Sequence, residues 1–275
     1  MSTTITIKNN KKVPANKAIK DVLMNNQISI YEYPEEPLDY YNCKLYVPGK
    51  SNLGVLINQD KDYINIWVNY FCNDADIDLA LYIARTLSLL CESDIFPGGY
   101  PEIFSWEDVD NGELKRYLFN STEGESASFL KSLIYNDMTV KLEGIDSDFY
   151  PDKTLIEEDV ELMDAKVNAR FLEIQNLEDQ GVRITNPIVA DMNGKKQTYV
   201  VISVGHRQLI ANCDMIVLAG EGENSFLAIP KSLFFENLGF KCEMVDRVQA
   251  IFPAIEREEF NAIMRRMKKF EVPII

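Results

Sequence analysis

The sequence contains few of the residues that build familiar metal and catalytic sites. It has one histidine, His206, and five widely spaced cysteines that form no CxxC pair. A single histidine excludes the HExxH zinc motif, and the lack of clustered thiols excludes Cys/His zinc sites. No GxSxG or GxxxxGK[ST] motif occurs, which excludes a nucleophile elbow and a P-loop. We therefore predict no metal ion, no other cofactor and no catalytic residue, with His206 as an ordinary residue at the end of a strand.

Long apolar runs and excess positive charge are also absent. No uninterrupted apolar run approaches the roughly 20 residues that cross a bilayer, because even residues 77–91 include Asp78 and Arg85. The N-terminus has no apolar stretch of signal-peptide length, and the cysteine pattern is typical of reduced thiols, so we expect a cytoplasmic protein. The formal net charge is −15, with 43 Asp and Glu against 28 Lys and Arg. This charge disfavours binding to nucleic acid and to anionic lipid.

The length and composition are those of a well-packed globular protein. With 275 residues, of which 46% are apolar, the chain can form one large domain or two ordinary ones. We predict an α+β fold, with antiparallel-rich sheets and helices packed on one side, in two subdomains. The polar segment 144–153 is the expected boundary, which gives an N-terminal α+β subdomain over 1–150 and a C-terminal one over 151–275. One continuous sheet through both halves is the alternative.

The N-terminal half combines short β-prone runs with helical patterns. Acidic residues open the segment 74–91, and its apolar residues then follow helical spacing, which predicts a helix. A second helix is expected near 126–134, followed by a strand over 137–143. The other predicted elements are a short helix over 16–24 and strands over 3–7, 28–33, 44–47, 53–57 and 63–71.

The C-terminal half has clearer β patterns. Asn193-Gly194 supplies the positive φ angles of a tight turn, so the runs 184–190 and 197–204 predict a hairpin. A helix is expected from Thr154 toward Asp164, and 167–174 fits either a helix or a strand. The remaining predictions are a strand pair over 214–219 and 225–229, a short helix that Gly239 ends, a strand over 240–251 and a closing helix over 255–270.

Two stretches of the chain are almost uniformly acidic, one in each predicted half. Residues 74–113 contain ten Asp and Glu with Arg85 as their one basic residue, and residues 143–164 contain nine with Lys153. Such stretches can form a field that steers a basic protein to the surface. The pattern Asp-x-Asp-x-Asp at 74–78 lacks the glycine and glutamate of a calcium loop and suits a helix N-terminus. The candidate partner-binding residues are Asp74, Asp76, Asp78, Glu107, Asp108, Asp110, Glu157, Glu158 and Asp159.

The chain resembles a known class of binding protein. A helix over 74–91 after a β-rich start, and the Asn193-Gly194 hairpin followed by Leu227-Ala228-Ile229-Pro230-Lys231, resemble the acidic cytosolic immunity proteins of bacterial polymorphic-toxin systems. The resemblance implies a non-catalytic protein that neutralises a toxin by binding it. It assigns no ligand residue.

Two other hypotheses remain open at this stage. The protein could be a structural subunit of a larger assembly, with the tyrosine- and proline-rich strip 31–48 and the closing helix as contact surfaces. It could also be a hydrolase in which paired carboxylates act with a divalent metal. We rank capture of a basic protein first, assembly second and catalysis third. The sequence does not specify the partner or the oligomeric state.

Overall fold

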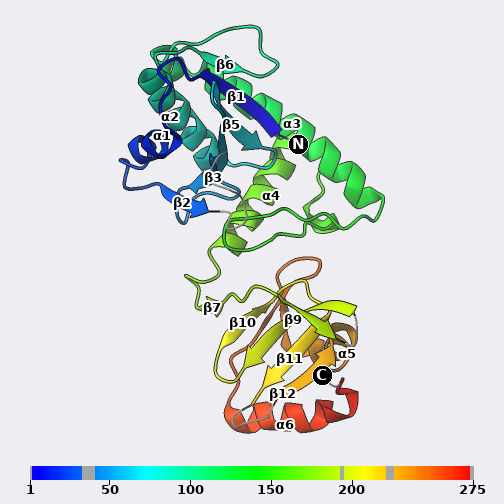
Figure 1. Cartoon of the computed structure of the whole chain (residues 1–275). Helices are drawn as coiled ribbons and strands as arrows, with labels where there is room; N and C mark the ends of the chain where they lie inside the picture. The colour runs from blue at the N-terminus through cyan, green and yellow to red at the C-terminus, as the bar shows by residue number, and fades with distance from the viewer. Residues whose placement is uncertain (1, 33–40, 193–194, 221–225, 273–275) are drawn as a thin grey trace. The chain divides into compact units, whose positions relative to one another are not determined.

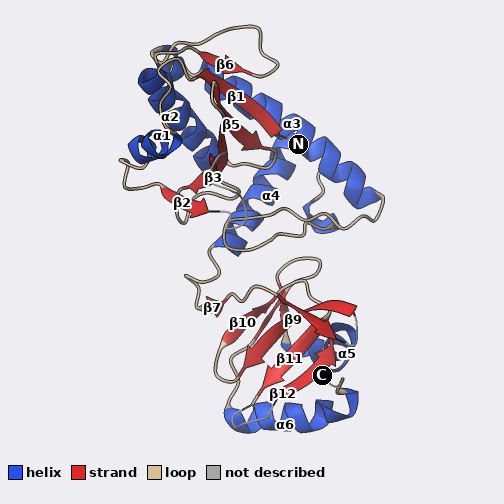
Figure 2. Ribbon diagram, viewed as in Figure 1, coloured by secondary structure: helices blue, strands red, loops and turns tan. Residues whose placement is uncertain are grey.

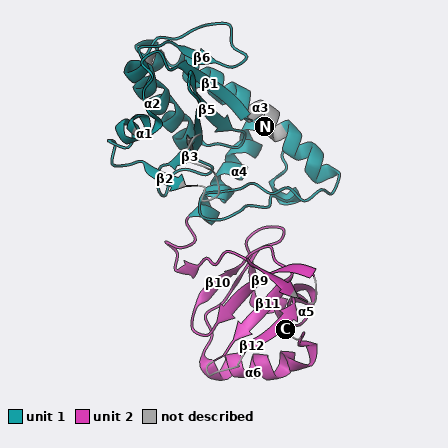
Figure 3. Ribbon diagram, viewed as in Figure 1, with its two compact units in different colours: residues 1–175 teal, residues 176–275 magenta. Residues whose placement is uncertain are grey.

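The chain folds as two compact units, residues 1–175 (unit 1) and residues 176–275 (unit 2) (Figure 1, Figure 3). The computed structural model describes residues 2–32, 41–192, 195–220 and 226–272. Helices and antiparallel-rich sheets occur in both units, which confirms the predicted α+β class. Within these described ranges, no helix is long and apolar enough to cross a membrane.

A six-stranded antiparallel sheet forms the centre of unit 1, in the order β2-β3-β4-β5-β1-β6. Successive side chains of a strand point to opposite faces. Ile5, Ile64 and Ile66 are therefore fully buried on one face, whereas Trp67 on the other is 37% exposed. The strands are β1 (Ser2–Lys8), β2 (Ser29–Glu32), β3 (Tyr41–Tyr46), β4 (Val55–Gln59), β5 (Tyr63–Asn69) and β6 (Ile95–Pro97).

The helices of unit 1 pack beside this sheet (Figure 2). Helix α2 contacts β1 and β5, and α3 contacts both α2 and α4. The helix predicted over 74–91 is confirmed, because Asn73 caps α2 and Cys91 is its last residue. The elements are α1 (Ala15–Val22), α2 (Asp74–Cys91), α3 (Glu113–Tyr135) and α4 (Val160–Gln175), with short 3-10 turns η1 (Asp108–Asn111) and η2 (Lys153–Leu155).

The division between the units lies later than residue 150. The polar segment expected to separate two subdomains is instead tied to α4 through Gln175, whose amide oxygen accepts the Asp146 N–H at 2.8 Å. The Gln175 side-chain nitrogen donates to the Ser147 carbonyl at 2.6 Å. Phe149 is buried, and its ring centroid lies 5.3 Å from that of Phe171 on α4. Burial and hydrogen bonding therefore keep the predicted linker and α4 inside unit 1.

Three local predictions in this part of the chain need correction. The strand expected over 137–143 does not form, because Asp137 has φ 58° and pairing is limited to one bridge between Leu142 and Phe149. The helix expected near 126–134 begins earlier, after Gly112. The helix expected from Thr154 begins at Val160 instead, and it continues through the undecided segment 167–174.

Unit 2 contains two four-stranded sheets, in the orders β12-β11-β9-β8 and β13-β14-β10-β7. Both predicted strand pairs form, since β8 pairs with β9 and β11 with β12, each antiparallel. The turn residues Asn193-Gly194 and residues 221–225 lie outside the described residues. The strands are β7 (Val182–Arg183), β8 (Ile188–Met192), β9 (Lys195–Ser203), β10 (Arg207–Ile210), β11 (Met215–Ala219), β12 (Phe226–Pro230), β13 (Glu243–Met244) and β14 (Ala250–Phe252).

The core of unit 2 lies between its sheets and its helices. Phe234, Phe252 and Phe260 are fully buried there in one cluster with the β9 and β11 side chains. The strand predicted over 240–251 is broken, because Asp246 accepts the N–H groups of Val248 and Gln249 in a tight turn. The helical elements are α5 (Lys231–Leu238), η3 (Gly239–Lys241), α6 (Arg257–Met267) and η4 (Lys268–Phe270).

Candidate functional site

Asp76, one of the predicted partner-binding residues, is a structural carboxylate. Its side chain is fully buried and accepts the backbone N–H groups of Leu53 at 3.2 Å and Gly54 at 3.0 Å. It also closes a capping box with Asn73 at the start of α2. Burial raises the pKa of Asp76, although these hydrogen bonds lower it. Asp76 therefore fixes the loop before β4 and cannot belong to an exposed acidic face.

The other predicted residues of the first acidic stretch have different surroundings. Asp74 and Asp78 are exposed on α2, where Asp78 pairs with Lys115 at 2.5 Å. Glu107 is exposed. Asp108 accepts the Ser105 hydroxyl at 2.6 Å, and this hydrogen bond lowers the Asp108 pKa. The Asp110 side chain lies outside the described part of the structure.

The second acidic stretch belongs to unit 1, together with the first. Glu157 forms an ion pair with Lys166, and Asp159 accepts the Leu162 N–H at 3.2 Å near the start of α4. Glu158 is exposed. The sequence placed one acidic stretch in each half, but the later boundary puts both in the same unit.

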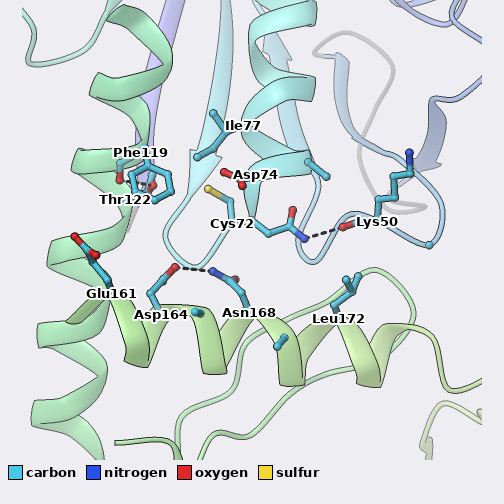
Figure 4. A pocket seen from close by; sticks show the side chains of 15 residues that line it. Lys50, Cys72, Asp74, Ile77, Phe119, Thr122, Glu161, Asp164, Asn168 and Leu172 are labelled. Carbon is cyan, nitrogen blue, oxygen red and sulfur yellow. Dashed lines mark hydrogen bonds between the residues drawn. The ribbon is translucent and has the colours of Figure 1, made fainter. Parts of the chain in front are cut away.

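Both stretches contribute to a pocket of about 490 Å³ in unit 1 (Figure 4). Asp74 comes from the first turn of α2, and Glu161 and Asp164 come from α4. We call this site the acidic pocket. Its lining residues are Gly49, Lys50, Cys72, Asn73, Asp74, Ala75, Ile77, Phe119, Thr122, Glu161, Asp164, Ala165, Asn168, Ala169 and Leu172.

Asp164 has the most perturbed carboxyl group of the acidic pocket. Burial raises its pKa to about 6, a hydrogen bond from Asn168 at 2.7 Å opposes that shift, and the nearby Asp74 charge adds to it. Among the residues that the structure describes, Asp164 has no ion-pair partner. Lys50 lines the same pocket, but its ammonium group is directed away from Asp164 (Figure 4). The acidic pocket thus holds a partly desolvated carboxylate that forms no ion pair with any described residue.

A hydrogen-bonded chain holds Asp164 in place. Asn52 is fully buried, and its amide donates to the Asn168 side-chain oxygen at 3.0 Å. Asn168 in turn donates to Asp164. The side-chain oxygen of Asn52, Oδ1, is buried and has no hydrogen-bond partner in the described part of the chain. The position of the carboxylate is therefore set by the loop before β4, which Asp76 also fixes.

The rest of the wall is largely apolar. Ile77, Leu172 and the Phe119 ring contribute to it, and Phe119 remains 37% exposed. Cys72 is buried in the wall, and burial raises the pKa of its thiol far above the ordinary value. Because thiolates are the reactive form, we assign Cys72 no nucleophilic role.

A second pocket, of about 550 Å³, lies at the C-terminal end of α2. Several of its polar groups are already hydrogen-bonded or ion-paired within the protein. Ser88 donates to the Ser93 carbonyl at 2.5 Å, Asn10 donates to the Glu92 carbonyl at 2.9 Å, and the Glu92 carboxylate pairs with Lys11 at 2.7 Å. The acidic pocket is therefore the better candidate for a binding site.

The structure also shows where possible metal ligands and the single histidine lie. Within the described ranges, no three His, Cys, Asp or Glu side chains converge as metal ligands. His206 is exposed in the turn between β9 and β10.

Sequence reasoning missed Glu161 and Asp164 as site residues. Both fall in the acidic stretch 143–164, but the sequence left open whether the helix running toward Asp164 continues through 167–174, and the structure extends it to Gln175. Once the whole of α4 is assigned, positions 161, 164, 165, 168 and 172 share one helix face, and that spacing identifies the wall of the pocket.

Comparison with known proteins assigns unit 1 to a family. No curated protein and no solved structure matches the chain. A family model described as "Domain of unknown function (DUF4299)" matches residues 2–177, which cover nearly all of unit 1 and include the acidic pocket. Because the match covers well over half of the chain, the protein belongs to the DUF4299 family.

Proposed function

We propose that unit 1 is a non-catalytic protein-binding module that captures a basic protein through the acidic pocket. The proposal depends on Asp164, a half-buried carboxylate that is repelled by Asp74 and has no cation beside it in the described residues. A cation placed there would offset both the desolvation of Asp164 and the repulsion. The wall is already formed, so a basic side chain can enter without rearrangement of the fold.

The exposed acidic residues around unit 1 add long-range attraction. Glu107, Glu158 and Asp159 are exposed and extend the negative charge beyond the pocket. Such charges raise association rates and are screened by salt, whereas a desolvated pair mainly slows dissociation. Asp78 and Glu157 have internal partners, so we assign them no direct role in capture.

An immunity protein that binds a basic toxin fits this proposal and the resemblance seen in the sequence. None of the five cysteines, each within the described ranges, forms a disulfide, which suits a reducing cytoplasm. We extend the proposal to that setting, with the toxin as the basic partner.

Affinity capture of the full chain from its host, followed by measurements with the purified partner, tests the proposal. The tagged protein is used at low and high salt, and the dissociation constant of the captured protein is then measured for wild type and Asp164→Asn. Asp94→Asn is the matched control, because Asp94 is exposed and follows the opposite end of α2. That helix has 18 residues, so its ends lie about 27 Å apart.

We expect a basic partner that is lost at high salt and is bound about tenfold or more weakly by Asp164→Asn, with Asp94→Asn unchanged. A partner that is not basic, or one that both variants bind as tightly as wild type does, would contradict the proposal.

A further inference from the structure

The acidic pocket differs from a simple negative patch because an aromatic ring forms part of its wall. Phe119 on α3 is 37% exposed, and Figure 4 shows it beside the space that Asp164 and Glu161 approach from α4. Aromatic faces attract cations that have lost part of their hydration. A ligand that suits this pocket therefore carries a positive charge and has a flat surface that can stack on the Phe119 ring.

The two basic side chains of proteins meet these demands unequally. A lysine ammonium is compact and strongly hydrated, whereas an arginine guanidinium is flat, more weakly hydrated and able to stack on a ring. The guanidinium also presents a fork of donors that can engage two carboxylate oxygens. Glu161 and Asp164 are three residues apart on one face of α4, so both lie within the reach of such a fork.

The hydrogen bonds of Asp164 leave room for that interaction. One carboxylate oxygen, Oδ2, accepts a hydrogen bond from the Asn168 amide. The Asn168 side-chain oxygen in turn accepts a hydrogen bond from Asn52. Oδ1 has no hydrogen-bond donor among the described residues. A small divalent cation fits less well, because it needs several converging oxygen ligands, and no group of three metal-ligand side chains occurs within the described ranges.

We infer that the acidic pocket is a receptor for one arginine side chain of the partner, with the guanidinium between the Asp164 carboxylate and the Phe119 ring. This inference rests on the proposed function and specifies which residue of the basic partner is captured. Asp164 supplies the charge pairing, and Phe119 determines the preference for arginine over lysine.

Three small probes test the inference on the full chain: N-acetyl-arginine methylamide, its lysine counterpart and its citrulline counterpart. Citrulline keeps the shape of arginine but lacks the charge. Binding is followed by NMR chemical shifts at pH 7.5 for wild type, Asp164→Asn, Phe119→Leu, Phe119→Trp and the control Asp94→Asn.

We expect the arginine probe to bind about tenfold more tightly than the lysine probe, and the citrulline probe not to bind measurably. Asp164→Asn removes binding of both cations. Phe119→Leu weakens the arginine probe about three- to tenfold and abolishes the preference, whereas Phe119→Trp keeps it. Phe119 is 37% exposed, and leucine and tryptophan are also apolar, so we expect these replacements to leave the fold intact.

Equal affinity for arginine and lysine, or a preference that persists in Phe119→Leu, would refute the inference, as would the absence of binding by every probe. These results are separable from the proposed function. If a basic protein is still captured in an Asp164-dependent manner, the function stands and the arginine assignment fails. If the arginine probe binds but no basic protein is captured, the arginine site stands and the protein-binding function fails.

Discussion

Replacing Asp164 by asparagine is expected to stabilise unit 1 at neutral pH. The carboxylate is partly desolvated in the folded protein, and burial raises its pKa from the ordinary 3.8 to about 6. One pKa unit corresponds to about 1.4 kcal/mol, so ionised Asp164 lowers the free energy of unfolding by at most about 3 kcal/mol, and solvent screening of this partly exposed group reduces that figure. Asparagine keeps an acceptor for Asn168 and removes the charge, and we expect a gain of about 1–3 kcal/mol.

The gain has a defined pH dependence. Between pH 3.8 and about 6, the folded state binds more protons at Asp164 than the unfolded state does. The stability of wild type relative to the variant therefore falls as the pH rises through this window. Above pH 6 the gain from Asp164→Asn is complete, and below 3.8 it disappears because the carboxyl is protonated in both states.

Urea unfolding followed by tryptophan fluorescence measures this effect in the relevant unit. Both tryptophans of the chain, Trp67 and Trp106, lie in unit 1, so the signal does not report on unit 2. The exposed carboxyl of Asp94 provides the control, and Asp94→Asn is expected to change stability by less than about 0.5 kcal/mol. A neutral or destabilising Asp164→Asn at pH 7.5, or a gain that is equal at pH 3.5 and 7.5, would refute the electrostatic reasoning.

Three further predictions concern the framework of the protein. Asp76→Ala leaves buried N–H groups of the loop before β4 without an acceptor. We expect urea unfolding, followed by tryptophan fluorescence, to show that the free energy of unfolding falls by about 3–5 kcal/mol. A fall of less than about 1 kcal/mol would mean that the carboxylate does not fix the loop. In Gly144→Ala the new Cβ would lie 2.3 Å from the Gln175 side-chain nitrogen and from the Ser147 carbonyl oxygen. We therefore expect the free energy of unfolding to fall by about 1–3 kcal/mol and the amide hydrogens of this segment to exchange faster. Unchanged exchange would contradict the packing. Residues 176–275 expressed alone are expected to fold around their own core, giving dispersed NMR spectra and cooperative melting, whereas a disordered fragment would show that the units depend on each other.

The elements that the sequence predicts well are those in which local pattern and burial agree. Helix α2 combines a capping residue, acidic first-turn residues and helically spaced apolar residues, and the expected range matches the structure. The strand pairs β8–β9 and β11–β12 follow β-prone runs on either side of turn residues. Segments that depend on contacts distant in the sequence were predicted less well. The polar segment 144–153 was expected to be a domain boundary, but Gln175 fixes it within unit 1 through Asp146 and Ser147.

The acidic pocket shows why charge pattern alone could not identify the site. Asp76 and Asp78 stand two residues apart in an acidic run, yet one is buried and the other lies on the surface. Asp164 gains its properties from Asn168, Asp74 and burial, and these depend on how α2 and α4 pack in unit 1. The sequence predicted a binding role for acidic residues, whereas the three-dimensional contacts show that Asp164 is partly desolvated and has no ion-pair partner in the described part of the chain.

The pKa of Asp164, measured by carboxyl NMR in the free protein and in the complex, tests the central claim most directly. The account predicts that Asp164 titrates near 6 when free and at least about one pH unit lower when the arginine probe or the captured protein is bound, because a bound cation favours the ionised form. A pKa near 4 in the free protein, or a value near 6 that does not change in the complex, would contradict it.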